Sequence, residues 1–332
     1  MFQNLIQLID KIQNKKIMVI GDMVADVYLE GKISRISREA PVLILEHSGE
    51  NVVPGGAANA VHNAATLGGQ VYAVGVIGDD NAGQQLTQIL NSKTVNTQGF
   101  IVDASRPTIT KTRVMAGGQA TVRQQVVRID RESKQALAGS VEKRLLGYVE
   151  DNIRHMDAVV ISDYGGLSIP ETLKKIVIDA CNKANIPSMV DSRYNVMDYT
   201  GIKLVKQNES EAANAVGLEV LDQNTLIQAG KTILEQLAAE AVLITQGPDG
   251  MTLFERSGSV AHIPVSNKSE VYDVTGAGDT VVVTMMLVLA AGASYYDAAR
   301  LANLAAGVVV RKPGTATASP AELKTAIGEY YQ

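Results

Sequence analysis

Short apolar runs recur along the chain, and stretches with helical spacing separate them. Each run is rich in Val, Ile or Leu and ends at glycine or polar residues, which is typical of a strand buried on both faces. Apolar strands that alternate with helices predict a mostly parallel sheet covered by helices on either side. The runs are residues 16–22 (KIMVIGD), 71–78 (VYAVGVIG), 157–165 (DAVVISDYG), 186–193 (IPSMVDSR), 202–211 (IKLVKQNESE) and 241–250 (AVLITQGPDG).

The polar residues at the ends of these runs are the first candidates for function. Parallel strands place their carboxyl ends on one edge of a sheet, and ligands bind beyond that edge. Packing alone does not explain why one edge should collect so many polar side chains. These residues are Asp22, Asp163, Asp191, Asn208 and the pair Gln246 and Gly247.

Two segments interrupt the alternation, residues 27–54 and 99–131. Both have the pattern of strands joined by turns, so we expect them to form a small β-sheet over the polar edge. Such a lid would exclude water from a reacting phosphoryl group. A surface hairpin without a role is the alternative. We therefore treat residues 1–332 as one domain with a lid made of two insertions.

Composition narrows the possible classes of function. The formal net charge is −5, and the chain has no long basic run, so a nucleic-acid-binding surface is not indicated. The single cysteine, Cys181, cannot form an intrachain disulfide, and the four histidines lack the spacing of zinc ligands. The N-terminal stretch does not resemble a signal peptide, and the apolar run at residues 281–292 is too short to cross a bilayer. We expect a cytoplasmic protein that acts neither on nucleic acid nor at a membrane.

Two common nucleotide-binding patterns do not fit the sequence. The form G-x-x-x-x-G-K-[ST] would need glycine where the chain has Thr225, and Gly230 lies inside a helical stretch. The dinucleotide pattern G-x-G-x-x-G fails because Val281 stands where its third glycine would be. A hydride-transfer enzyme is therefore not favoured.

The segment VYDVTGAGDT, residues 271–280, precedes an apolar run typical of a buried helix. Gly276, Ala277 and Gly278 lack bulky side chains, so their N–H groups can approach an anion to which the helix also presents its positive end. Such a site would stabilise a transferring phosphoryl group. Asp279 stands at the helix start, where it could accept a proton from an attacking hydroxyl or cap the helix. The segment alone leaves these two roles open.

Taken together, three motifs resemble those of the ribokinase-like (PfkB) carbohydrate kinases. VYDVTGAGDT looks like the second signature of that family, and PGGAANAVHNAATLGG (residues 54–69) looks like the first. NESE, residues 208–211, is similar to the family's N-x-x-E motif. The resemblance covers essentially the whole chain. It implies a three-layer α/β/α sandwich with a mostly parallel central sheet, a small β-sheet lid and ATP- and Mg²⁺-dependent phosphorylation of a sugar.

The resemblance also implies a role for each matching residue. Asp279 would be the general base, and the anion hole would consist of Gly276, Ala277 and Gly278. Asn208 and Glu211 would organise Mg²⁺ through water, because Mg²⁺ keeps part of its hydration shell. Relatives also suggest a monovalent cation such as K⁺ between the backbone of residues 273–275 and the loop 312–314. The sugar hydroxyls would be held by Asp22, Asp26, Gly55, Gly56, Asn59 and Asp163. The nucleotide would be held by Asn208, Glu211, Thr245, Gly247, Asn303 and Gly307.

Within the family, the chain most resembles kinases that phosphorylate D-glycero-β-D-manno-heptose 7-phosphate at its anomeric oxygen. The similarity lies in residues 21–42 and in the segments RPTITKTRVMAGGQ and NLAAGVVVRKPGTATASP. The product would be the 1,7-bisphosphate, a precursor of ADP-heptose for lipopolysaccharide. The related bifunctional enzyme also carries a nucleotidyltransferase half, which we do not expect in residues 1–332. A phosphorylated substrate needs a cationic clamp, for which the lid offers Arg35, Lys111, Arg113 and Arg128.

Three segments depart from the pattern of this subgroup. Residues 37–41 are SREAP rather than SPEAP, residues 162–167 are SDYGGL where S-D-Y-x-K-G is usual, and residues 191–193 are DSR instead of DPK. The missing lysine leaves the sugar open, with fructose, ribose and hexose phosphates as alternatives. A sugar or nucleotide sensor without catalysis is a third interpretation, although the GAGD and N-x-x-E motifs argue against it. The apolar lid strand VLILE, residues 42–46, predicts a homodimer that pairs two lids.

Overall fold

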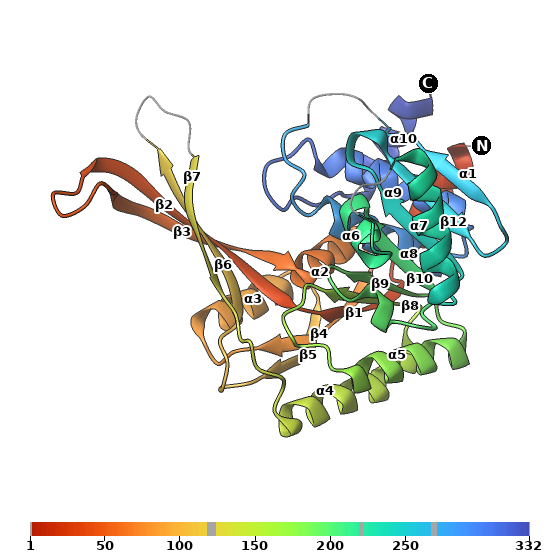
Figure 1. Ribbon diagram of the computed structural model, residues 1–332, viewed down its shortest axis with the longest axis horizontal. Coiled ribbons are helices and arrows are strands. Elements are labelled where there is room, and N and C mark those ends of the chain that lie inside the picture. The colour runs from red at the N-terminus through yellow and green to blue at the C-terminus, as the bar shows by residue number, and fades with distance from the viewer. Residues whose placement is uncertain (1, 118–123, 219–221, 267–270, 332) are drawn as a thin grey trace.

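The computed structural model describes residues 2–117, 124–218, 222–266 and 271–331. Within them a nine-stranded sheet has the order β13-β12-β11-β10-β9-β8-β1-β4-β5 (Figure 1). All neighbouring pairs from β5 to β11 are parallel, and β12 is antiparallel to both of its neighbours. The strands are β1 (Lys16–Gly21), β4 (Gln70–Ile77), β5 (Asn96–Val102), β8 (Ala158–Asp163), β9 (Ser188–Ser192), β10 (Leu204–Asn208), β11 (Ala241–Thr245), β12 (Met251–Glu255) and β13 (Val260–Ile263).

Helices cover both faces of this sheet, which confirms the expected three-layer α/β/α arrangement. Alternate residues of β1 show how the faces are assigned: Ile17 and Val19 belong to one apolar cluster, whereas Met18 and Ile20 belong to the other. The first cluster packs under α1 (Phe2–Lys11), α2 (Ala57–Thr66), α3 (Asn81–Asn91), α8 (Ala277–Ala290), α9 (Tyr295–Val309) and α10 (Pro320–Tyr331). The second packs under α4 (Gly139–Asn152), α5 (Glu171–Ala184), α6 (Glu209–Ala215) and α7 (Gln223–Gln236).

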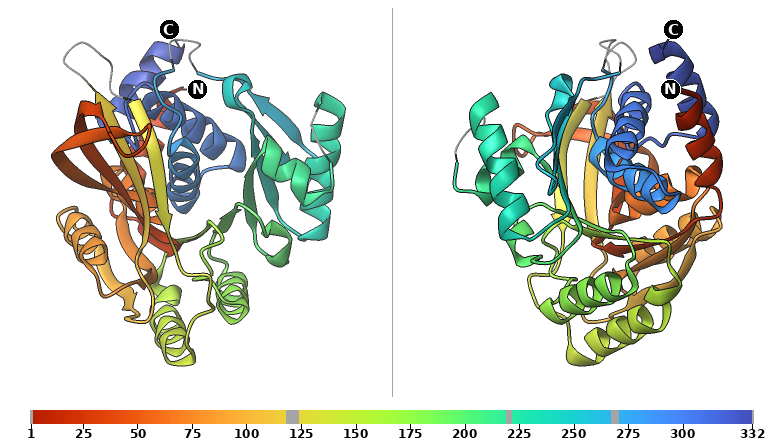
Figure 2. Two further views of the ribbon diagram at one scale, coloured as in Figure 1. Left: turned by 60° about the vertical axis from the view of Figure 1, so that its left-hand side comes forward. Right: turned by 90° about the vertical axis from the view of Figure 1, so that its right-hand side faces the viewer.

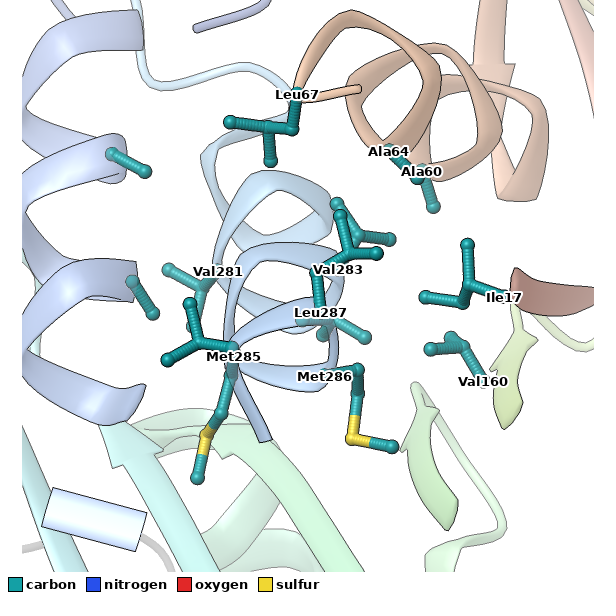
Figure 3. Packing of buried hydrophobic residues seen from close by; sticks show 14 of the residues in the cluster. Ile17, Ala60, Ala64, Leu67, Val160, Val281, Val283, Met285, Met286 and Leu287 are labelled. Atoms are coloured by element: carbon teal, nitrogen blue, oxygen red, sulfur yellow. The ribbon is translucent and has the colours of Figure 1, made fainter. Parts of the chain in front are cut away.

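Helix α8 is the apolar run that follows the GAGD motif. Its residues from 279 to 288 are all buried, because α2, α9 and the sheet enclose it. Figure 3 shows Val283, Met286 and Leu287 of this helix facing α2 and the strands β1 and β8. A helix that is apolar on all sides belongs in a core of this kind. None of the helices in the described part of the chain has the length and apolarity needed to span a membrane.

A second sheet of four strands stands beside the larger one (Figures 1 and 2). It begins one residue after the carboxyl end of β1, so it rises from the edge where the polar residues gather. In the order β3-β2-β6-β7 its strands are β3 (Leu43–Gly56), β2 (Met23–Ile36), β6 (Ile109–Gly117) and β7 (Gln124–Arg131).

The boundaries of the expected lid need a correction. Strand β5, which includes residues 99–102, pairs with β4 in the larger sheet, so the second lid segment starts at Ile109 rather than at residue 99. The first segment is longer than expected at both ends, because β2 starts at Met23 and β3 continues to Gly56. Residues 118–123 of the expected lid lie outside the described residues.

Candidate active site

Asp279 lies in the first turn of α8 and is only 5% exposed. Gly276 precedes the helix with a left-handed backbone, φ 79°, which glycine adopts at little cost. A Cβ at this position would lie 2.4 Å from Nδ2 of Asn59. The GAGD motif therefore owes its first glycine both to the turn and to the close approach of α2.

Two side chains donate hydrogen bonds to the Asp279 carboxylate. Nδ2 of Asn59 donates to Oδ2 at 2.7 Å, and the Tyr164 hydroxyl donates to Oδ1 at 2.9 Å. The amide of Asn59 is itself oriented, because Nδ2 of Asn63 donates to its Oδ1 at 3.2 Å and the Thr280 hydroxyl donates to Oδ1 of Asn63 at 2.8 Å. The carboxylate is thus fixed from two sides.

The surroundings of Asp279 set its pKa in a range that suits a general base. Burial raises the pKa, the hydrogen bond from Asn59 lowers it, and the carboxylate of Asp191 raises it again. Tyr164 and Lys206 both lower it, and the pKa comes to about 6. Asp279 is therefore ionised at neutral pH, yet basic enough to accept a proton from a hydroxyl whose charge develops during attack.

The anion-binding part of the site differs in one detail from the expectation. The N–H of Ala277 donates to the Val274 carbonyl at 3.2 Å within the turn, so this group already has a partner. The first N–H groups of a helix lack intrahelical acceptors, which leaves those of Gly278 and Asp279 for an anion. The anion hole expected from Gly276, Ala277 and Gly278 stays a prediction, in which the N–H of Ala277 already has an acceptor within the turn.

A buried ammonium group lies directly beneath this helix start. A Cβ on Gly278 would come within 2.9 Å of Nζ of Lys206, and Lys206 is 5% exposed. Its Nζ is 2.9 Å from Oδ2 of Asp191. Burial lowers the pKa of Lys206, but Asp191 and Glu211 outweigh burial and raise it. Lys206 is therefore charged and faces the place where an anion would bind.

Sequence reasoning did not assign a role to Lys206, although one signal was present. Lys206 directly follows the apolar residues Leu204 and Val205 in a predicted buried strand, and a lysine in a buried strand needs a partner or a function. Tyr164 was also missed. It follows strand β8 directly, but its contact with Asp279 joins residues that are far apart in the sequence.

Asp22 and Asp163 are turned toward the protein. Oδ2 of Asp22 accepts the N–H groups of Tyr164 and Gly166 at 2.8 and 3.0 Å, and its Oδ1 accepts the hydroxyl of Ser168. Burial raises the pKa of Asp22. Both oxygens thus already hold the loop of residues 164–168, which we call the β8 loop. The expected contact of Asp22 with a sugar stays a prediction.

Asp163 serves the same loop from the other side. It accepts the N–H of Gly165 at 3.0 Å, the hydroxyl of Ser192 at 2.9 Å and that of Tyr199 at 2.8 Å. Tyr199 belongs to the apolar cluster on the face of the sheet opposite to α8. Asp163 thus has a structural role that ties β8 to β9, and its expected contact with a sugar stays a prediction.

The glycines of the first motif also act through close packing. Gly56 has φ 51° and caps α2, and its Cβ would lie 2.9 Å from the Asp22 carbonyl. A Cβ on Gly55 would lie 2.6 Å from Oδ2 of Asp26. Asn59 is fully buried and donates to Asp279. In this structure the motif orients Asp279 through Asn59, and the expected contact of Asn59 with a sugar stays a prediction.

The structure brings three of the four expected clamp cations to one face of the lid. Arg113 lies opposite Arg128 in the pairing of β6 with β7, and Lys111 shares their face two residues away. Each arginine is already paired with a carboxylate: Nη1 of Arg113 with Asp26 at 2.6 Å, and Nε of Arg128 with Asp130 at 2.9 Å. The two arginines can therefore bind a phosphate only in competition with these carboxylates.

Lys111 and Arg35 differ most in their position relative to the site. Nζ of Lys111 lies 5.3 Å from the centre of the Tyr164 ring, beside the proposed base. Arg35 is exposed and lies seven residues beyond Tyr28 on β2. Because Tyr28 pairs with Arg113, Arg35 is displaced from Arg113 along the strand by roughly 20 Å. The structure thus removes Arg35 from the expected cluster within one chain.

The N-x-x-E motif forms a capping box at the start of α6. Oδ1 of Asn208 accepts the N–H of Glu211 at 2.8 Å, and a carboxylate oxygen of Glu211 accepts the N–H of Asn208 at 2.9 Å. Burial raises the pKa of Glu211, and Lys206 lowers it. No group of three or more His, Cys, Asp or Glu in the described part of the chain is arranged to hold a metal ion. One carboxylate with an amide oxygen fits a Mg²⁺ ion held mainly by water and nucleotide phosphates.

The expected nucleotide residues fall in two places. Thr245 ends β11, and its hydroxyl lies 3.4 Å from the Gln207 carbonyl; Gly247 follows with φ 55°. On α9, Nδ2 of Asn303 donates to the Pro264 carbonyl at 2.7 Å, and a Cβ on Gly307 would lie 2.5 Å from the Ser266 hydroxyl. Asn303 and Gly307 therefore hold the segment after β13 against α9.

The two segments expected to hold a monovalent cation lie together. The Asp273 carboxylate accepts the N–H of Thr275 and the N–H of Gly314, both at 2.9 Å. The N–H of Asp273 also reaches the Val310 carbonyl at 3.1 Å. These contacts bring the 273–275 backbone and the 312–314 loop to one place just before α8.

The chain has the ribokinase-like α/β fold. It is similar to Arabidopsis thaliana ribokinase, solved with ribose and ATP (TM-score 0.72, 19% identity, 96% of this chain and 99% of that one). It is also similar to Escherichia coli phosphofructokinase-2 solved with substrates and products (TM-score 0.75, 20% identity, 96% and 100%). These identities are low and show the shared fold alone.

The chain belongs to the pfkB family of carbohydrate kinases, whose family model matches residues 14–322. It is 40% identical over 312 residues to a protein named bifunctional protein HldE from Geobacter sulfurreducens, covering 94% of this chain and 62% of that protein. A protein of the same name from Helicobacter hepaticus is 38% identical, with 94% and 63% covered. The chain thus spans less than two thirds of the length of these relatives. The expected sugar phosphotransferase activity is confirmed at the level of the family.

Proposed function

We propose that the protein transfers the γ-phosphoryl group of ATP to the anomeric hydroxyl of D-glycero-β-D-manno-heptose 7-phosphate. The observation that carries the proposal is Asp279, a buried and ionised carboxylate held at the start of α8 beside a charged lysine. The resemblance of the lid and C-terminal segments to heptose 7-phosphate kinases supports the choice of sugar. Similarity to the HldE proteins over 94% of the chain agrees with it.

In this proposal Asp279 accepts the proton of the attacking hydroxyl. The N–H groups at Gly278 and the ammonium of Lys206 face the transferring phosphoryl group and stabilise its charge. Asn208 and Glu211 would hold hydrated Mg²⁺, which neutralises the phosphate oxygens when it is bound with ATP. We propose that a monovalent cation binds where the 273–275 and 312–314 segments meet, and that this cation is K⁺. The structurally similar Escherichia coli phosphofructokinase-2 was solved with potassium.

The 7-phosphate would meet the lid face that carries Lys111, Arg113 and Arg128. Lys111 is the favoured contact because no carboxylate within the described residues forms an ion pair with it, whereas both arginines are paired. The β8 loop lacks the lysine that is usual in heptose kinases. A kinase for another sugar phosphate, fructose or ribose is therefore the second candidate.

A substrate panel tests the proposal. ADP release is measured with ATP and Mg²⁺ on D-glycero-β-D-manno-heptose 7-phosphate, sedoheptulose 7-phosphate, fructose 6-phosphate, ribose and fructose. Turnover on the manno-heptose phosphate alone supports the proposed sugar. Turnover on another sugar would leave the proposed role of Asp279 unchanged but would require a new assignment of the residues that bind the substrate phosphate. ATP binding without ADP release for any sugar would favour the sensor interpretation instead.

Substitution of Asp279 tests the base directly. Asp279→Asn should keep the fold and nucleotide binding while losing most turnover. The matched control is Asp179→Asn on the exposed side of α5, which should behave as wild type. Near-normal turnover in Asp279→Asn would show that the base has been misassigned.

We further propose a homodimer that pairs two lids. The second sheet exposes large apolar side chains on otherwise polar strands, and burying them against a second copy would cover its edges. Sedimentation at micromolar concentration tests this, and a strictly monomeric mass would contradict it. The exposed apolar residues of this sheet, together with Val42 just before β3, are Ile33, Ile36, Val42, Leu43, Val126, Val127 and Ile129.

A further inference from the structure

The β8 loop, residues 164–168, is folded back against the body of the protein. Gly165 and Leu167 both have a left-handed backbone, with φ 78° and 58°, and such a conformation is costly for leucine. Three groups of this loop donate to Asp22, as described above, and Asp22 is 1% exposed. The loop is thus held in one conformation by a buried carboxylate.

This conformation sets the position of the Tyr164 hydroxyl. The N–H of Tyr164 donates to Asp22 at 2.8 Å, and its hydroxyl donates to Oδ1 of Asp279 at 2.9 Å. One residue therefore links the two buried carboxylates. Nζ of Lys111, from the lid strand β6, lies 5.3 Å from the centre of the Tyr164 ring, so the lid borders the same side chain.

We propose that Tyr164 is a positioning residue for phosphoryl transfer: its hydroxyl holds the Asp279 carboxylate in a fixed orientation and in the unprotonated form. The proposal rests on the proposed role of Asp279 as the base. The phenol keeps its own proton throughout, because burial and the carboxylates of Asp279 and Asp191 raise the pKa of Tyr164 well above its ordinary value. Tyr164 can therefore donate a hydrogen bond but does not compete as a base.

The groups around Asp279 show what the loss of this hydrogen bond would do. Asp191 on β9 raises the pKa of Asp279, as burial does, whereas Asn59 on α2, Tyr164 and Lys206 on β10 lower it. Without the Tyr164 hydroxyl, one of the three groups that lower the pKa of Asp279 is lost. A hydrogen bond to a charged group corresponds to a shift of about one to two pH units. At a pH well below the wild-type midpoint, about 10- to 100-fold less of the Asp279 carboxylate would be ionised.

Infrared titration of the protonated carboxyl band tests the proposal without a substrate. The Asp279 band is assigned as the one missing from Asp279→Asn, and its midpoint should lie at about pH 6 in the wild type. Tyr164→Phe should raise the midpoint by one to two pH units. The control is Tyr194→Phe, whose ring adjoins Gly165 but is 68% exposed, and its midpoint should match the wild type. An unchanged or lowered midpoint in Tyr164→Phe would overturn the proposal.

Kinetics then separate this inference from the proposed base. For the sugar on which the wild type releases ADP, the acidic limb of kcat/KM should move up by the same one to two pH units in Tyr164→Phe and stay in place in Tyr194→Phe. If Asp279→Asn loses turnover but Tyr164→Phe keeps the wild-type pH profile, only the role of Tyr164 is wrong. If Asp279→Asn keeps turnover, the base itself is wrong, whatever Tyr164 does to the infrared midpoint.

Discussion

The ion pair of Lys206 with Asp191 allows stability and catalysis to be separated. The pair is buried, with 6% and 12% of the two side chains exposed and 2.9 Å between Nζ and Oδ2. Removing one partner of a buried pair leaves an uncompensated charge and costs about 3–5 kcal/mol. With a urea m-value of about 3 kcal/mol/M, the midpoint of unfolding of Lys206→Met should fall by about 1 to 1.7 M.

The double variant Lys206→Met with Asp191→Leu is the matched control. Replacing both charges by apolar side chains is often neutral or stabilising, so its urea midpoint should return to near that of the wild type. Asp191 raises the pKa of Asp279 and Lys206 lowers it, so their joint removal takes away two effects of opposite sign on the protonation of Asp279. Any remaining loss of turnover then reflects the missing positive charge at the phosphate site.

We expect that loss to be large in both variants. Lys206 lies beneath the helix start where the transferred phosphoryl group would bind, and loss of one donor at such a site costs about 100- to 1000-fold in turnover. ADP release and urea unfolding are measured on the same preparations. If the double variant were as stable and as active as the wild type, Lys206 would be only the structural partner of Asp191, and the assignment of the phosphate site would be wrong.

Three further predictions follow from single contacts. Gly56→Ala should lose about 2 kcal/mol or more of unfolding free energy, because φ 51° is strained for alanine and the added Cβ would meet a backbone carbonyl at 2.9 Å. The control Gly139→Ala, whose Cβ would meet nothing within 4 Å, should keep its stability. Equal urea midpoints for the two variants would refute the prediction. Tyr199→Phe should lose about 1.5–3 kcal/mol with unchanged kcat/KM if Asp163 is structural, and a fall in kcat/KM without loss of stability would return Asp163 to the sugar site. The hydrogen bond from Lys312 lowers the pKa of Glu322 to about 2. The stability that the wild type has over Glu322→Gln should therefore be full above pH 4.5, decrease as the pH falls and vanish near pH 2. A difference in stability that does not change with pH would contradict this prediction.

The fold and the position of Asp279 at a helix start could be predicted from the sequence because their signals are local. The apolar runs give the strands, and GAGD before an apolar run gives a helix start with Asp279 on it. The partners of Asp279 are not local: Asn59 lies 220 residues away along the chain and Tyr164 lies 115 residues away. Only the packing of α2 and β8 against α8 brings them together, so no motif could reveal that Asn59 serves the base.

The direction in which a polar side chain points was also beyond the sequence. Asp22 and Asp163 end neighbouring strands, as predicted, yet both accept hydrogen bonds from the β8 loop, because backbone N–H groups in a buried turn must find acceptors. Arg35 belongs to the lid by sequence, but the length of β2 carries it away from Lys111. Strand length and loop hydrogen bonding decide such positions, and neither follows from residue spacing.

The packing of α8 suggests how chemistry and substrate choice are divided in this enzyme. Because α8 is enclosed by α2, α9 and the sheet (Figure 3), its N-terminus has little freedom to move, since close-packed interiors do not deform continuously. Asp279, the proposed base, and the ammonium of Lys206 beneath the helix start are therefore fixed before a sugar arrives. Adaptation to a particular sugar must then come from the parts that border Asp279 without belonging to the core, which are the β8 loop and the lid face with Lys111. The β8 loop is also one of the three places where the chain departs from the heptose kinase pattern. The substrate panel therefore tests the loop and the lid, whereas substitution of Asp279 tests the core.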